Sequence, residues 1–290
     1  MPLSQPLVDL ALSIPGLQRA ADALAACFDG ALGALGPAQQ PLKDVLNGTW
    51  LGHPAHPPIT DVPVGAWSAA LVLDLLGERR GAKIAVGVGL LGAVGAAATG
   101  IADWRDVHNV RPRNLGVVHA ALNGTATLLY GASYVLRGRG DTEERRAIAL
   151  AATGYAIALL SALYGGEIAF DLQVGPNYAH GTNPPPDDAD AGALADVADG
   201  GMSRVIVQGY PVLLTRRGDE VSAISAVCAH QGGPLERGVL EGDVVRCPWH
   251  GSRFCVRDGA LVNGPSAYPQ PAFRARVVDG RVRVAAVTPL

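Results

Sequence analysis

The feature that most constrains this chain is a set of long segments without charge in its first 170 residues. Residues 84–102 carry no charged side chain, residues 115–136 contain only His119 as an ionisable group, and residues 147–166 again carry no charge. A helix needs about 20 apolar residues to cross the hydrocarbon core of a bilayer, so each segment is long enough to span a membrane. A soluble domain of this size would need several helices that are apolar on every side, which globular folds rarely offer.

A shorter apolar segment, residues 62–76, precedes these three and contains Asp74. Charged residues make up 17% of the chain, against about 25% in typical soluble domains. In residues 84–102, small side chains recur every four positions, on one helix face where a neighbouring helix can approach closely. They are Ala85, Gly89, Ala93 and Ala97. We therefore predict a multi-pass, all-α transmembrane four-helix bundle over residues 51–174.

The regions on either side of the bundle differ from it in composition. Residues 1–50 have apolar residues at helical spacing, which predicts an amphipathic helix lying on the membrane surface or on the rest of the protein. Residues 175–192 are rich in Pro and Asp and are typical of a solvated linker. Residues 193–290 contain short Val- and Ile-rich runs between turn residues, which predict a compact antiparallel β domain. The runs are residues 204–207, 211–215, 221–226, 244–246 and 281–284.

Two Cys–His pairs in the β domain carry the chemistry. Cys228-Ala-His230 is followed after 16 residues by Cys247-Pro-Trp-His250. Two Cys and two His can hold a tetrahedral zinc ion, but zinc fingers pair Cys with Cys and His with His along the chain. A cluster with two unlike irons takes both thiolates on one iron and both imidazoles on the other. The mixed order favours such a cluster, with zinc as the alternative.

This pattern, including Cys-Pro-x-His-Gly in the second pair, resembles the Rieske ferredoxin family over residues 193–290. The resemblance implies an all-β, Rieske-type antiparallel sandwich that transfers single electrons. It also implies a [2Fe–2S] cluster bound by Cys228, His230, Cys247 and His250.

Departures from other Rieske proteins refine this expectation. Members of quinol-oxidising complexes have two further cysteines, whose disulfide braces the cluster loops; Gly233 and Trp249 stand at those positions here. Ser252 stands where high-potential members place a hydroxyl that donates a hydrogen bond to a cluster sulfur, so we count it among the cofactor-binding residues. Their tyrosine donor is replaced by Phe254. One donor instead of two implies an intermediate-to-low reduction potential.

The bundle carries a second, looser resemblance. Residues 44–170, beginning near His53-Pro-Ala-His56, resemble a bacterial four-helix membrane domain of unknown function. His53, His56 and His119 raise the hypothesis of a b-type haem, although structural histidines are commoner than ligands and haem is the less favoured interpretation. Lys and Arg are more frequent in the loops after the first and third segments. The positive-inside rule then places these loops in the cytoplasm and the cluster domain outside the cytoplasm.

These observations predict a membrane-tethered carrier of single electrons between a membrane or respiratory donor and an unidentified acceptor. A ferredoxin component of an oxygenase system, and a redox sensor or scaffold without net electron flow, are the alternatives. No His follows His250 to build a mononuclear iron site, which favours an electron-transfer protein over a stand-alone enzyme. Expected partners are redox proteins at the cluster face, membrane lipid and, less strongly, a quinone. The net charge of −3 and the lack of a basic cluster argue against nucleic acid.

Overall fold

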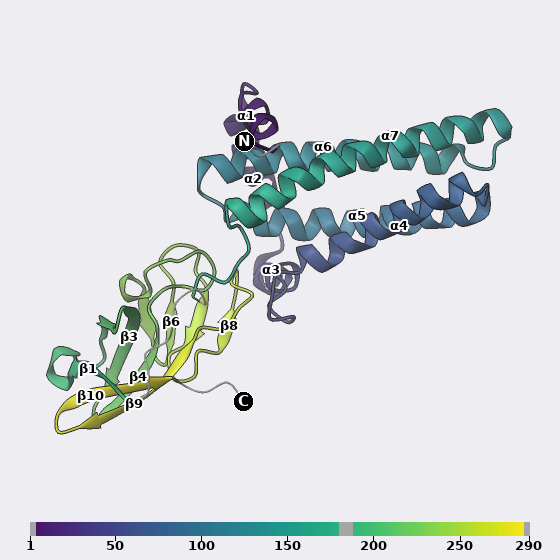
Figure 1. Ribbon diagram of the computed structural model, residues 1–290. Coiled ribbons are helices and arrows are strands. Elements are labelled where there is room, and N and C mark those ends of the chain that lie inside the picture. Colours follow the sequence, from purple (N-terminus) through teal and green to yellow (C-terminus); the bar gives the residue numbers. More distant parts are fainter. Residues whose placement is uncertain (1–3, 180–187, 287–290) are drawn as a thin grey trace. The chain divides into compact units, whose positions relative to one another are not determined.

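The computed structural model describes residues 4–179 and 188–286, and it divides into two compact units. Among these residues, 4–39 and 55–174 form a helical unit, and 40–54, 175–179 and 188–286 form a β unit (Figure 1). The segment 40–54, which we expected partly within an N-terminal region and partly within the bundle, belongs with the β unit.

The helical unit consists of two short helices followed by four long ones. The short helices are α1 (Ser4–Leu12) and α2 (Leu17–Gly33). The long helices are α4 (His56–Leu75), α5 (Arg79–Arg105), α6 (Val110–Leu136) and α7 (Asp141–Gly166), and a π-helical turn over Glu167–Asp171 extends α7. The four predicted apolar segments thus all lie in long helices.

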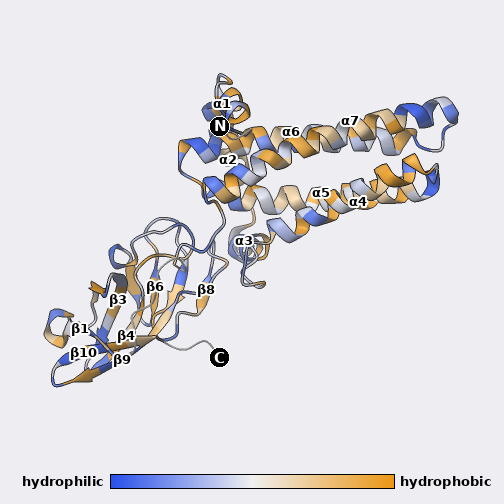
Figure 2. Cartoon of the chain, in the orientation of Figure 1, coloured by the Kyte–Doolittle hydropathy of each residue, from blue (hydrophilic) through white to orange (hydrophobic). Residues whose placement is uncertain are grey.

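Hydropathy separates these four helices into two pairs. Within the described residues, two helical stretches combine the length and hydropathy of a membrane span: Arg79–Arg105 and Asp141–Asp171. Helices α4 and α6 fall short, because α4 contains prolines and Asp61 and the middle of α6 contains polar residues such as His119 and Asn123. The prediction of four helices is therefore better supported than the prediction that all four span a membrane. Figure 2 shows the hydrophobic residues along these helices and hydrophilic residues at their ends.

The four long helices form two hairpins with matching side-chain layers. Helix α4 packs on α5 and α6 packs on α7, and contacts of α5 with α6 and of α4 with α7 leave α4 and α6 on a diagonal. Trp67 of α4 stacks on Tyr130 of α6, with ring centroids 4.0 Å apart. One end of the bundle contains a buried bidentate ion pair, in which Arg137 donates to both carboxylate oxygens of Asp74 at 2.7 and 2.6 Å.

Both pairs join residues 63 positions apart, which indicates that one hairpin repeats the other. The small face of α5 lies where expected, since a Cβ atom at Gly89 would overlap the Trp67 indole. On α7, Gly154, 65 positions after Gly89, lies against Tyr130 in the same way. The hairpins are therefore structural equivalents despite their different side chains.

Helices α1 and α2 pack on this bundle. Val8 and Ala11 of α1 form a buried cluster with Leu115 and Tyr164. Arg113 of α6 donates to the carboxylate of Asp22 on α2 at 3.0 Å. These contacts favour the interpretation of the N-terminal helices as packed on the rest of the protein.

The β unit contains two antiparallel sheets, as predicted. One has six strands in the order β1-β10-β9-β4-β3-β2, and the other has four in the order β5-β6-β7-β8. The strands of the larger sheet are β1 (Ala189–Ala193), β2 (Met202–Val207), β3 (Tyr210–Arg217), β4 (Glu220–Ser225), β9 (Ala272–Val278) and β10 (Arg281–Ala286). Those of the smaller sheet are β5 (Val239–Glu241), β6 (Val244–Arg246), β7 (Arg253–Cys255) and β8 (Leu261–Asn263). Helix α3 (Gln39–Asn47) accompanies them in this unit apart from its first residue.

Four of the five predicted strand runs fall within these strands, and the fifth, residues 221–226, extends one residue beyond the end of β4 at Ser225. Asp279 and Gly280 both have positive φ, 48° and 75°, and join β9 to β10 in the two-residue turn that suits the twist of a hairpin. Strand β1 was not predicted, because its residues fall at the end of the expected linker 175–192. Part of that linker, residues 180–187, lies outside the described residues.

Candidate metal centre

Two loops of identical hydrogen-bond pattern carry the four predicted ligands. In the first, the N–H of Cys228 donates to the carbonyl of Gly233 and that of Gly232 donates back to the carbonyl of Cys228, both at 2.9 Å. In the second, Cys247 donates to Ser252 at 2.8 Å and Gly251 donates back to Cys247 at 3.2 Å. Gly232 and Gly251 have φ of 75° and 80°, a conformation that costs glycine little. Each loop therefore closes over five residues and turns its ligands toward the other loop.

The loops bring like donors together. The Nδ1 atoms of His230 and His250 lie 3.1 Å apart, and the ring planes are perpendicular. The thiols of Cys228 and Cys247 are hydrogen-bonded to each other, and both are buried. Two sulfur donors and two nitrogen donors thus form two pairs. This arrangement fits two unlike irons.

Backbone N–H groups converge on the two sulfurs. Those of His230 and Gln231 point at Cys228, and those of Trp249 and His250 point at Cys247. The hydrogen bond between the thiols, together with burial, raises the pKa of Cys228 well above its usual value. The same hydrogen bond, with the two amides, lowers the pKa of Cys247 to about 7. The amides directed at each sulfur favour its thiolate, which is the form that binds metal, and the hydrogen bond between the thiols places the negative charge on Cys247.

The positions that lack the disulfide face each other across the loops. A Cβ atom at Gly233 would lie 2.8 Å from Sγ of Cys247 and 3.2 Å from the Trp249 indole. The indole packs here while remaining 56% exposed. Packing of a ring on a glycine thus takes the place of a covalent brace between the loops.

Ser252 and Phe254 differ sharply in their surroundings. Ser252 is fully buried, and its Oγ accepts a hydrogen bond of 2.9 Å from the N–H of Ser266. Its own hydroxyl hydrogen remains available as a donor. Phe254 is buried in the apolar core that also contains Cys228 and Cys247, so it contributes packing and no hydrogen bond.

The domain that contains these loops is similar to known proteins. Residues 189–274 match the family model described as the Rieske [2Fe-2S] domain. The chain is 36% identical to Ferredoxin CarAc of Metapseudomonas resinovorans over 94 residues, which are 32% of this chain and 88% of that protein. The chain belongs to the Rieske family. The Rieske domain implies a [2Fe–2S] cluster and electron transfer.

Three further similarities accompany this one. The biphenyl 2,3-dioxygenase ferredoxin component of Rhodococcus jostii (strain RHA1) is 37% identical over 89 residues, which are 31% of this chain and 83% of the relative. The solved ferredoxin of carbazole 1,9a-dioxygenase from Nocardioides aromaticivorans IC177 is 31% identical, covering 35% of this chain and 99% of that chain, with a TM-score of 0.33. Residues 52–177 match the family described as a predicted membrane protein (DUF2231). The chain thus joins a Rieske domain to a predicted membrane domain.

Sequence reasoning missed a buried glutamine that supports the first Rieske loop. Gln270 accepts a hydrogen bond of 3.1 Å from the N–H of Ala229, between Cys228 and His230. Its amide donates to the carbonyls of Ser225, at 3.0 Å, and Val227. Gln270 lies 41 residues after Ala229, outside any motif of adjacent residues.

Two segments remote in sequence also support the Rieske loops. The N–H of Tyr178, from the expected linker, donates to the carbonyl of Ala229 at 3.1 Å. Asp44, from the N-terminal segment of the β unit, accepts a hydrogen bond of 2.9 Å from the N–H of Gly264. The Rieske domain therefore includes supports from outside its family match.

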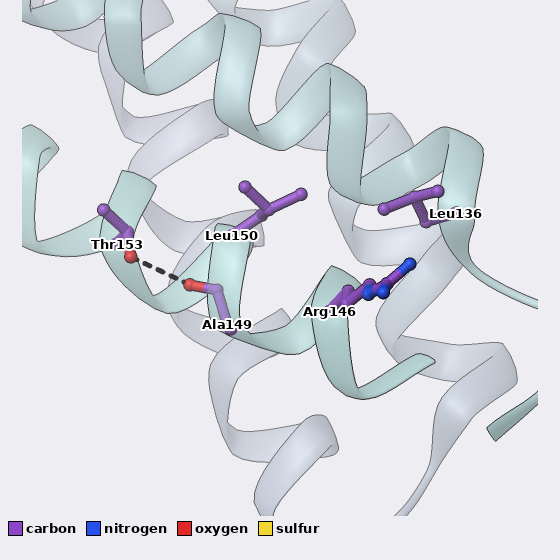
Figure 3. Close-up of a pocket in the computed structure, with 5 residues that line it drawn as sticks. All are labelled: Leu136, Arg146, Ala149, Leu150 and Thr153. Carbon is purple, nitrogen blue, oxygen red and sulfur yellow. Dashed lines mark hydrogen bonds between the residues drawn. The ribbon is translucent and has the colours of Figure 1, made fainter. Parts of the chain in front are cut away.

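The histidines considered for haem are not among these ligands. His53 is an exposed residue of the segment 40–54, whereas His56 and His119 belong to the helical unit. The groove in Figure 3, lined by Leu136 of α6 and by Arg146, Ala149, Leu150 and Thr153 of α7, contains none of the predicted site residues. The Thr153 hydroxyl there donates to the carbonyl of Ala149 at 2.9 Å, within its own helix.

Proposed function

We propose that Cys228 and Cys247 bind one iron of the [2Fe–2S] cluster and that His230 and His250 bind the other. The observation that carries this proposal is the pairing of the two thiols and of the two imidazole Nδ1 atoms, 3.1 Å apart, by two loops of one pattern. A zinc ion held by all four residues would require the four donors to surround one point.

The chain's own groups prepare this site for one-electron chemistry. The bound cluster supplies a reversible one-electron couple. Amides directed at the cysteine sulfurs, and the Ser252 hydroxyl, offset the additional negative charge of the reduced form. His230 and His250 are only half-buried, so an imidazole edge offers electrons a path to a docked protein. Trp249, exposed beside His250, forms part of that docking surface.

The domain arrangement supports a tethered carrier. We infer a multi-pass membrane bundle within residues 55–174 of the helical unit, followed by a Rieske domain that includes strand β1 and lies outside the cytoplasm. Large side chains near the middle of the bundle helices are exposed, such as Leu91 at 78% and Leu128 at 77%, which suits contact with lipid. The carrier would take electrons from a membrane or respiratory donor, with a quinone as one such donor.

A ferredoxin for an oxygenase is the second candidate. It is favoured by the relatives, since two are named as ferredoxins or ferredoxin components and one of these belongs to biphenyl 2,3-dioxygenase. In that case a reductase and an oxygenase would dock in turn at the exposed imidazole edge.

Electron paramagnetic resonance of the dithionite-reduced full chain in detergent tests the cluster. We expect the rhombic signal of a Rieske centre in the unaltered protein and its loss in His230→Ala and His250→Ala. Cys255→Ser and His53→Ala are matched controls, because neither residue is a proposed ligand, and both should retain the signal. A protein purified without oxygen that contains zinc and no iron would overturn the assignment.

The electron donor can be tested with the same preparation in liposomes. Reduction of the cluster by decylubiquinol in a single-turnover experiment would support the role of a membrane-tethered carrier. Reduction by an NADH-dependent flavin reductase of a dioxygenase system, with no reaction with the quinol, would replace it with the oxygenase ferredoxin. Slow reduction by both donors would overturn each carrier role in favour of the sensor.

A further inference from the structure

The repeated hairpins of the helical unit contain a third equivalent pair of residues. His56 of α4 and His119 of α6 are 63 positions apart, like Trp67 with Tyr130 and Asp74 with Arg137. Along each helix the three residues follow at intervals of 11 and 7, close to whole numbers of turns, so they share one face. That face meets its counterpart in the stacked rings and in the buried ion pair.

Each histidine is held in the same way by the second helix of its hairpin. Nδ1 of His56 lies 2.9 Å from the carbonyl oxygen of Ala96, and Nδ1 of His119 lies 2.9 Å from that of Ser161. Because a carbonyl only accepts, both Nδ1 atoms carry the hydrogen and both Nε2 atoms present a lone pair. This is the arrangement of a metal-binding histidine, whose other nitrogen donates to a backbone carbonyl.

A glycine makes room for each ring at equivalent positions. A Cβ atom at Gly100 would lie 2.7 Å from the His56 ring, and one at Gly165 would lie 3.1 Å from the His119 ring. The two glycines are 65 positions apart, as are Ala96 and Ser161. The two hairpins therefore share the tautomer of the histidine, its carbonyl partner and the glycine that makes room for its ring. A histidine with only a structural role in one hairpin would not require this duplication.

The histidine pair differs from the other two pairs in chemistry. The tryptophan–tyrosine and arginine–aspartate pairs are complementary, whereas His56 and His119 are identical donors. Two imidazoles from opposite hairpins suit a ligand that accepts a lone pair from each side. A porphyrin iron has this requirement, because four of its six ligands belong to the macrocycle and two come from the protein.

We propose that Nε2 of His56 and Nε2 of His119 are the axial ligands of a b-type haem held between the two hairpins of the bundle. The side-chain nitrogen of Asn123 lies 3.1 Å from Nε2 of His119, so iron binding requires this amide to release the imidazole. The site is independent of the Rieske cluster, to which the helical unit contributes no ligand.

The test is spectroscopic and uses the full chain purified in detergent from cells supplied with 5-aminolevulinate. We expect one haem per chain by the pyridine haemochrome assay, a Soret band and a low-spin ferric signal. His56→Ala and His119→Ala should each lower the haem content at least tenfold, while His53→Ala should not change it. The Rieske signal of the same sample reports the folding of the β unit and the helical circular dichroism signal reports that of the helical unit, so loss of haem alone is distinguished from loss of the fold.

A replacement that preserves ligation covers the case in which the alanine variants misfold. His56→Met and His119→Met should retain haem with a shifted absorption spectrum. Chains with a full Rieske signal that lack haem and also give no Soret shift when titrated with haemin would overturn the proposal. Stoichiometric copper, zinc or iron without porphyrin, or full haem content in the alanine variants, would overturn it equally.

Discussion

The β unit and the helical unit both use duplication, but only one of the two duplications can be read from the sequence. The Rieske loops repeat a five-residue pattern whose ligands are the same residue types, so the Cys–His pairs stand out. The hairpins repeat at intervals of 63 to 65 residues, and their equivalent residues are mostly complementary rather than identical, as with Asp74 and Arg137. Sites built from identical ligands are visible as motifs, whereas pairs that stabilise an interface become visible only when they meet in the fold.

Removal of the buried ion pair should destabilise the interface between the two hairpins more than any other change considered below. Arg137→Met leaves the carboxylates of Asp74 and Glu144 buried without their partner, since all three side chains are at most 3% exposed. We expect a loss of about 3–5 kcal/mol in the free energy of unfolding of the bundle. Thermal unfolding in detergent, followed by circular dichroism, measures this change.

Two further variants define the origin of that loss. Adding Asp74→Leu to Arg137→Met should restore part of the stability, because one uncompensated charge is removed. Arg79→Ala, which breaks only an exposed pair with Asp141, should leave the melting temperature unchanged. Equal melting temperatures for all of these variants would show that the ion pair does not hold the hairpins together.

The glycines beneath the stacked rings test whether the two hairpins are energetically equivalent. In Gly89→Ala the added methyl group overlaps the Trp67 indole, and we expect destabilisation by about 1–3 kcal/mol. In Gly154→Ala the nearest atoms of Tyr130 are 3.2 Å away, so the gain in helix propensity offsets much of the crowding. Gly124→Ala, with open space around it, should be neutral or stabilising. If Gly89→Ala lowers the stability of the bundle no more than Gly124→Ala does, the close contact between Gly89 and the Trp67 indole would be contradicted.

Much of the β unit could be predicted because its signals are local. The ligands lie within two short loops, and the predicted strands alternate in burial or pair with their immediate neighbours. Strand β1 was missed because its Ala-Asp-Ala-Gly-Ala sequence has no strand signal of its own and depends on pairing with β10. Gln270 and Asp44 were missed because their partners lie 41 and 220 residues away. In the bundle, helices could be predicted from apolar length, but the hairpin interface could not.

Gln270 tests how far a remote residue sets the geometry of the Rieske loops. Gln270→Ala removes three hydrogen bonds and leaves the buried N–H of Ala229 without its acceptor. We expect a loss of about 1–3 kcal/mol in the stability of the Rieske domain. The cluster should bleach at a lower temperature, as seen in its visible absorption. Gln270→Glu keeps the acceptor but places a buried carboxylate against the carbonyl oxygens of Ser225 and Val227, so its bleaching temperature should be no higher than that of the alanine variant.

Ser252 tests the hydroxyl expected to reach a cluster sulfur. Ser252→Ala removes a donor that favours the reduced cluster, so the midpoint potential should fall by about 20–60 mV, the equivalent of one hydrogen bond in a one-electron couple. Redox titration followed by paramagnetic resonance measures this shift. Ser203→Ala, on an exposed part of strand β2, is the control and should leave the potential unchanged. An unchanged potential in Ser252→Ala would mean that the hydroxyl serves only as the acceptor for Ser266.

The smallest expected effect comes from the exposed counterpart of the buried ion pair. Asp190 of β1 accepts a hydrogen bond of 3.0 Å from Arg281 of β10, and this bond holds the pKa of Asp190 below its usual value. A depressed pKa contributes stability that is present above the unfolded-state pKa and is lost as the pH falls through the folded-state pKa. Asp190→Asn should therefore melt at a slightly lower temperature than the unaltered chain at pH 7. The two should melt together once the pH is low enough to protonate Asp190 in both the folded and the unfolded state of the unaltered chain. A deficit that persists at acid pH would assign the effect to strand pairing, because a charge pair stabilises only while both partners are ionised.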